Sequence, residues 1–170
     1  AAAAVVGEGA RRTALMRVFE YPAGVGTGSA EHTDWGVVTV IAMGETAEPA
    51  LEFWGGDAVG WVGVPHREDA LVVNVGDWMA VMSKGRAVSP RHRVVLGWER
   101  RWSMVLFWYP EWGFRVGEVE EEVRKGLEGK ISLVEDQRDG GRGKLWDKLE
   151  GMEFGAFVEE KWSQVRRLAG

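Results

Sequence analysis

Short apolar stretches separated by turn-forming residues run through the first two thirds of the chain. Eight of them, bounded by Gly, Pro, Asp or Lys, cover residues 15–22, 37–43, 51–54, 60–64, 70–75, 78–82, 91–96 and 102–109. Short strands at roughly 8–12-residue spacing are typical of an antiparallel sandwich or barrel. The intervening residues 23–30 are rich in Gly, Ala and Ser, which predicts a loop. We therefore expect a mainly β fold.

The pattern changes after Pro110 and becomes helical. Apolar residues four apart between 119 and 127 predict a short amphipathic helix in an acidic stretch, and residues 139–143 predict a Gly-rich loop. A clearer helical stripe is formed by Val158, Trp162, Val165 and Leu168. We expect this last helix to pack outside the sheet. Residues 15–110 would then be the β core, and residues 111–170 a helical extension of the same domain.

Composition limits the classes of function. The 170 residues suffice for one domain with a substantial core. A net charge of −5 without a basic stripe argues against nucleic-acid binding. The absence of cysteine excludes disulfides and thiolate metal sites. No apolar run approaches the roughly 18 residues of a membrane span. We expect a cytoplasmic monomer that binds neither nucleic acid nor membrane.

Two histidines and one aspartate form the most informative polar pattern. His32 and Asp34 are two positions apart, and His92 follows Asp34 after 58 positions (92 − 34). In an extended segment, residues two apart point to one face, so both can reach one ion. Two imidazoles and one carboxylate are the ligand set of iron sites that keep further positions open. A His-x-Asp pair such as His32 and Asp34 also occurs by chance in solvated loops. A solvated loop without a metal therefore stays open as an alternative. The remaining histidine, His66, lies in a polar turn and is interpreted as a surface residue.

Arg101 and Ser103 form a second pair on one predicted strand. A guanidinium donates two charge-assisted hydrogen bonds to a carboxylate, and a serine hydroxyl can add a third. The alternatives are an ion pair between Arg101 and Glu99, and a small core residue at Ser103. Val105, Phe107 and Tyr109 continue the face of Arg101 and Ser103 along this predicted strand. Arg17, Phe19 and Tyr21 share one face of the first predicted strand, at residues 15–22.

Taken together, these segments resemble the catalytic domain of the iron- and 2-oxoglutarate-dependent dioxygenases, in particular the isopenicillin N synthase-like branch. The resemblance covers about residues 15–110, in the family's order and at near-family spacing. It rests on Phe19-Glu-Tyr-Pro22, His32-Thr-Asp-Trp-Gly36 with Thr39, Leu51-Glu-Phe-Trp54, Gly60-Trp61, Val72-Val-Asn-Val-Gly-Asp77, Ser89-Pro-Arg-His-Arg-Val94, and Arg101-Trp-Ser103 with Phe107 and Pro110. Residues 154–162 are similar to the family's closing helix. The resemblance implies a double-stranded β-helix, also called a jelly roll or cupin-like fold.

The resemblance also implies residue roles. His32, Asp34 and His92 would ligate Fe(II). Arg101 and Ser103 would hold the distal carboxylate of 2-oxoglutarate, assisted by Tyr21. The substrate pocket would include Phe107, with Tyr109, Phe19, Trp35 and Arg17 as further candidates. Structural roles are expected for Asn74, Gly76, Asp77 and Arg93.

The implied activity is oxidation of a small organic molecule with O2, by hydroxylation, desaturation or ring formation, with release of succinate and CO2. Because Asp34 is retained, the halogenating variant of this chemistry is disfavoured. Two alternatives stay open: a non-catalytic, truncated jelly roll that binds metal, and an oxidase that uses the same iron site without 2-oxoglutarate. Family members usually carry a helical N-terminal region, which we expect to be missing from this chain.

Overall fold

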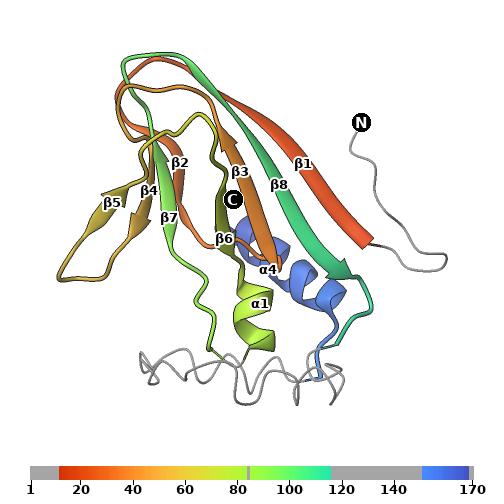
Figure 1. The fold of residues 1–170 in the computed structure, drawn as a ribbon. Coiled ribbons are helices and arrows are strands. Elements are labelled where there is room, and N and C mark those ends of the chain that lie inside the picture. Colours follow the sequence, from red (N-terminus) through yellow and green to blue (C-terminus); the bar gives the residue numbers. More distant parts are fainter. Residues whose placement is uncertain (1–11, 84, 116–150, 169–170) are drawn as a thin grey trace.

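Two four-stranded antiparallel sheets face each other in the computed structural model, which describes residues 12–83, 85–115 and 151–168 (Figure 1). The helix and loop predicted within residues 119–143 lie outside the described residues. The main sheet has the order β1 (Arg12–Tyr21), β8 (Arg101–Glu111), β3 (Val38–Met43) and β6 (Val72–Val75). The second sheet has the order β2 (Thr27–His32), β7 (His92–Val95), β4 (Leu51–Trp54) and β5 (Trp61–Gly63). The predicted mainly β jelly roll is confirmed.

The register of the main sheet decides which side chains face the second sheet. Arg101 lies opposite Tyr21, and Ser103 lies opposite Phe19 on one side and Met43 on the other. Directly opposed residues of an antiparallel pair share a face, so these side chains belong to one layer. One buried core lies between the sheets and consists of Tyr21, Ile41, Leu51, Val94 and Val105. The sequence-based placement of Arg101 with Ser103 on one strand face, and of Phe19 with Tyr21 on another, therefore agrees with the register.

Two predicted elements are wrong. Residues 27–30, predicted as part of a loop, belong to β2, because pairing with β7 satisfies a backbone that has almost no apolar side chains to bury. The close approach of the sheets favours its small residues: a Cβ on Gly28 would lie 2.9 Å from the Tyr21 ring. Residues 78–82, predicted as a strand, belong to the short helix α1 (Asp77–Met82). Trp78 and Val81, three apart, are buried on one helical face, which a strand would place on opposite sides.

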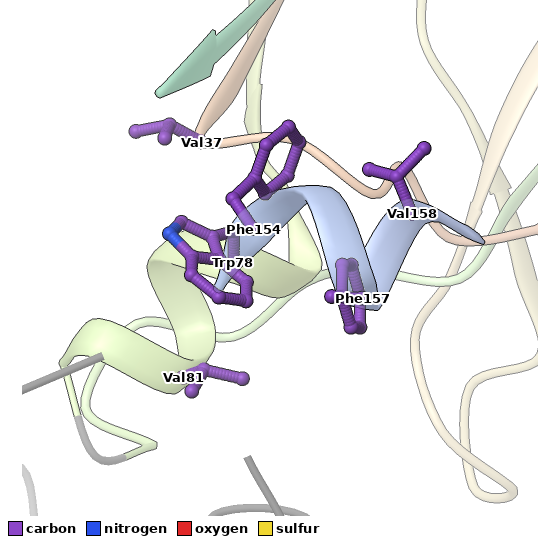
Figure 2. Packing of buried hydrophobic residues seen from close by; sticks show 6 residues of the cluster. All are labelled: Val37, Trp78, Val81, Phe154, Phe157 and Val158. Carbon is purple, nitrogen blue, oxygen red and sulfur yellow. The ribbon is translucent and has the colours of Figure 1, made fainter. Parts of the chain in front are cut away.

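A second core joins α1 to the C-terminal helix α4 (Phe154–Leu168). Figure 2 shows Trp78 of α1 packed against Phe154 and Phe157 of α4, and the ring centroids are 5.2 and 5.3 Å apart. Trp78 and Phe154 are completely buried. The predicted helix thus exists outside the two sheets, where it covers α1 and the adjoining end of the main sheet.

The outer face of the main sheet is apolar and exposed. Val18 of β1 is 60% exposed, and Trp102, Met104 and Trp108 of β8 are each nearly half exposed. In β8 the neighbours of these residues on the inner face are buried or half-buried, so strand alternation in burial continues there although both faces carry apolar residues. None of the helices in the described ranges has the length and apolar character needed to cross a bilayer.

Candidate functional site

Pairing of β2 with β7 brings the two histidines together. His32 is the last residue of β2 and lies directly opposite His92, the first residue of β7. Their ring centroids are 4.3 Å apart. Asp34 follows in the loop after β2, with its side chain only 4% exposed. Strand register, rather than closeness in sequence, therefore assembles this group.

The ligand atoms of the three side chains converge on one point. Asp34 Oδ1 is 3.7 Å from Nε2 of His32 and 3.7 Å from Nε2 of His92. All three ligand atoms lie within 4.8 Å of one another. Imidazole and carboxylate bonds to a transition metal such as zinc are about 2.0–2.2 Å long, so two of them can span the 3.7 Å between Asp34 Oδ1 and either histidine Nε2. The geometry therefore fits a single metal ion, and the donor set is that of non-haem Fe(II) sites.

Hydrogen bonds orient both imidazoles for metal binding. Nδ1 of His32 is 2.7 Å from the Ala30 carbonyl oxygen, and Nδ1 of His92 is 3.1 Å from the Pro90 carbonyl oxygen. A carbonyl only accepts, so each Nδ1 carries the proton and each Nε2 offers its lone pair. Burial lowers the pKa of His92, against the opposing effect of Asp34. The hydrogen bonds thus set the tautomer of each ring, and the burial of His92 favours the neutral imidazole that a metal requires.

Asp34 is held from several sides by residues 74–77. The Asn74 side-chain amide donates to Asp34 Oδ2 at 2.8 Å, and the Asp77 backbone N–H donates to the Asp34 carbonyl at 2.7 Å. The Asp77 carboxylate also accepts hydrogen bonds from Thr33 and from Lys161 of α4, both at 3.1 Å. Sequence reasoning gave this segment only a structural role. It missed the contact of Asn74 with a ligand, because no spacing rule connects residues 34 and 74.

Arg101 is a buried cation with no ion-pair partner among the described residues. Arg101 is 6% exposed, and its Nε and Nη2 have no hydrogen-bond partner among the described residues. Its guanidinium carbon lies 4.3 Å from the centroid of the Tyr21 ring. Burial lowers the pKa of Arg101, while it raises the pKa of Tyr21 despite a hydrogen bond with Ser103. The alternative ion pair of Arg101 with Glu99 is not formed; instead, the unsatisfied donors suit a bound carboxylate.

A cavity of about 60 Å³ connects these two groups. The candidate metal ligands His32, Asp34 and His92 line it. Arg101, Ser103 and Tyr21 line it as well. The remaining lining residues are Phe19, Ser29, Thr39, Ile41, Met43, Leu51, Val94, Val105 and Phe107. Two aromatic candidates lie elsewhere: Trp35 packs against Trp162, with ring centroids 5.2 Å apart, and Tyr109 against Phe154 at 5.6 Å. Arg17 is exposed and does not line the cavity.

Known proteins similar to this chain are oxygenases. The chain is 39% identical over 80 residues to the 2-oxoglutarate-dependent dioxygenase tropC of Talaromyces stipitatus, an alignment covering 47% of this chain and 24% of the relative. It is 36% identical over 103 residues to gibberellin 2-beta-dioxygenase 2 of rice, covering 58% and 28%. The fold resembles that of the dioxygenase for auxin oxidation 1 of Arabidopsis thaliana, solved as a complex with 2-oxoglutarate, with a TM-score of 0.53, 25% identity and coverage of 57% and 38%.

The chain spans about a quarter of the length of the two curated relatives, from Talaromyces and rice. A family model, that of the 2OG-Fe(II) oxygenase superfamily, matches residues 12–110. That match contains both strands that carry the histidines, the loop that carries Asp34 and the strand that carries Arg101. The chain therefore belongs to the 2OG-Fe(II) oxygenase superfamily.

Proposed function

We propose that the protein is an Fe(II)- and 2-oxoglutarate-dependent dioxygenase that oxidises a small organic molecule. One observation carries the proposal: a two-histidine, one-aspartate metal group and an unpaired buried arginine line a single cavity. The first is a ligand set for Fe(II), and the second is a binding partner for a carboxylate. Neither group alone would distinguish this function from simple metal or anion binding.

The chain's own residues have separate tasks in this proposal. His32, Asp34 and His92 would hold the metal at the wall of the cavity, which all three side chains line. Arg101 and Ser103 hold the distal carboxylate of 2-oxoglutarate, and Tyr21 supports the guanidinium through its ring. When bound, Fe(II) and 2-oxoglutarate supply the oxidising chemistry with O2, in which one oxygen atom enters succinate, CO2 is released, and the other oxygen atom oxidises the substrate.

Apolar side chains exclude water from the space between the two groups. Phe19 and Phe107 line the cavity together with aliphatic side chains of both sheets. A dry wall protects a reactive centre from side reactions and strengthens the charge interactions within it. We propose Phe107 and Phe19 as substrate-pocket residues. For Tyr109, Trp35 and Arg17 that role remains a prediction, since they lie outside the cavity lining.

The substrate class is proposed from the relatives and from the size of the site. The rice relative is named for a small organic molecule, a gibberellin. Membership of the isopenicillin N synthase-like branch, a monomeric state, a cytoplasmic location and the absence of nucleic-acid and membrane partners remain predictions from the sequence.

The test is addition of Fe(II) and 2-oxoglutarate without oxygen. We expect the weak visible charge-transfer band of the iron chelate, and its loss in the variant His92→Ala. Exposure to O2 with a panel of small molecules should then give succinate in step with substrate loss. An absent band, or a band that survives His92→Ala, would contradict the proposal.

Two alternatives give different results in the same experiment. A metal-binding jelly roll without turnover would bind Fe(II) but form no succinate. An oxidase that uses no 2-oxoglutarate would consume its substrate without succinate, with Arg101 and Ser103 binding a substrate carboxylate instead. The unpaired state of Arg101 fits either carboxylate, so the succinate measurement decides between them.

A further inference from the structure

Asn74 makes the two oxygens of the Asp34 carboxylate unequal. Oδ1 lies 3.7 Å from both histidine Nε2 atoms, whereas Oδ2 accepts the hydrogen bond from Asn74 Nδ2 at 2.8 Å. One oxygen is therefore turned to the metal position, and the other is engaged by the protein. Asn74 is itself only 6% exposed, so water does not compete freely for this bond.

We propose that Asn74 is a positioning residue that keeps Asp34 a one-oxygen ligand and thereby preserves the open side of the metal. A carboxylate can bind a cation through one oxygen or through both. The second mode would occupy a coordination position on the side facing the cavity. The inference rests on the proposed function, in which 2-oxoglutarate needs two positions on that side.

The surroundings of Asn74 support a role directed at Asp34. Its Oδ1 has no hydrogen-bond partner within the described residues, whereas its Nδ2 donates to Asp34. The reverse orientation of the amide would set an oxygen against the carboxylate, where neither atom can donate. A buried amide with one unsatisfied atom is costly, and an apolar residue would fill the same place in a strand better. The hydrogen bond to Asp34 is what the asparagine adds.

Backbone contacts fix the distance between Asn74 and Asp34. Asn74 lies opposite Thr39 in the pairing of β6 with β3, the strand that follows the Asp34 loop. Two residues later, a Cβ on Gly76 would lie only 2.2 Å from the Gly36 carbonyl oxygen. The glycine therefore allows β6 to end against the loop. This close approach places the amide within hydrogen-bond reach of the ligand.

The test compares Asn74→Ala with Val72→Ala in the protein loaded with Co(II), which reports its coordination through visible absorption. Val72 is a matched control, because it is half-buried on the same face of β6 but packs in the core between the sheets. For Asn74→Ala we expect a changed cobalt spectrum, weaker binding of 2-oxoglutarate to the cobalt protein, and an affinity for Co(II) lowered about 10- to 100-fold, as for other outer contacts of metal ligands. For Val72→Ala we expect a lower unfolding temperature but the wild-type spectrum and affinity.

Each other outcome overturns the inference. A wild-type spectrum with 2-oxoglutarate affinity within about threefold of wild type would assign Asn74 to the fold alone. If Asn74→Ala does not fold, Asn74→Leu, which fills the volume without a donor, carries the same readout. Failure of both variants to fold would also overturn it. If the wild-type protein binds neither Co(II) nor 2-oxoglutarate, the proposed function fails together with this inference.

Discussion

Replacement of Arg101 by methionine is the sharpest test of the cosubstrate end of the cavity. The guanidinium is buried, two of its nitrogens have no partner among the described residues, and no carboxylate neutralises it there. Methionine keeps much of the length and volume of the side chain but removes the charge and all donors. We therefore expect Arg101→Met to lose binding of 2-oxoglutarate while the fold remains.

The size of the effect follows from the burial of the charge. Removing one partner of a buried, hydrogen-bonded charge pair costs about 2–5 kcal/mol. At about 1.4 kcal/mol per tenfold change, this weakens 2-oxoglutarate binding by about 30-fold to 4000-fold. In the ligand-free protein two effects oppose each other. The contact with the Tyr21 ring, worth about 0.5–2 kcal/mol, is lost. The cost of burying an unpaired charge is lost as well.

The assay is calorimetric titration of the metal-loaded protein with 2-oxoglutarate in the absence of oxygen, with thermal unfolding of the ligand-free protein beside it. Arg100→Met is the matched control, because Arg100 is the preceding residue, is exposed and pairs with Glu20 at 2.9 Å. The control should bind 2-oxoglutarate as wild type does. An affinity of Arg101→Met within about threefold of wild type would refute the assignment of Arg101 to the carboxylate.

Three further predictions concern stability. Trp78→Ala should lower the free energy of unfolding by about 3–5 kcal/mol, because the residue is fully buried; Trp98→Ala, at a position 79% exposed, should change it by less than about 0.5 kcal/mol in denaturant titrations. Gly76→Ala should cost at least about 1–3 kcal/mol, because the added Cβ meets backbone, whereas Gly113→Ala meets nothing within 4 Å; equal unfolding temperatures would contradict this. Burial lowers the pKa of His92 below the usual 6.5, so this side chain binds a proton more readily in the unfolded chain than in the folded protein. The metal-free protein should therefore lose stability as the pH falls from about 7 to about 5, and the variant His92→Gln should lose it less steeply.

Most strands were predictable because they bury alternate side chains between two layers. The segments at 37–43, 51–54 and 102–109 are short apolar stretches rich in β-branched or aromatic residues, and the structure places strands there. Two segments were not predictable in this way. The small residues of β2 carry almost no apolar signal, and α1 is too short for helical periodicity to separate it from a strand. In both cases contacts distant in sequence decided the conformation.

The candidate site, too, could be predicted from the sequence only in part. The residue types are fixed by the sequence: two histidines and an aspartate for a metal, and an arginine and a serine for a carboxylate. Their meeting in one cavity depends on strand register, since His32 faces His92 only because β2 pairs with β7 in this alignment. The partner of Asp34 depends on it too, because β6 must lie beside β3 for Asn74 to reach the carboxylate.

The sequence by itself thus determined the β architecture and the chemistry that the side chains can perform. The tertiary structure alone decided that Arg101 is buried without a partner, that Asn74 engages one oxygen of Asp34, and that Trp35 and Tyr109 pack against α4. The physical reason is that hydrophobic periodicity and residue chemistry are local properties of the chain. Burial, pairing and the distance between ligand atoms arise only when segments far apart in sequence are brought into one register.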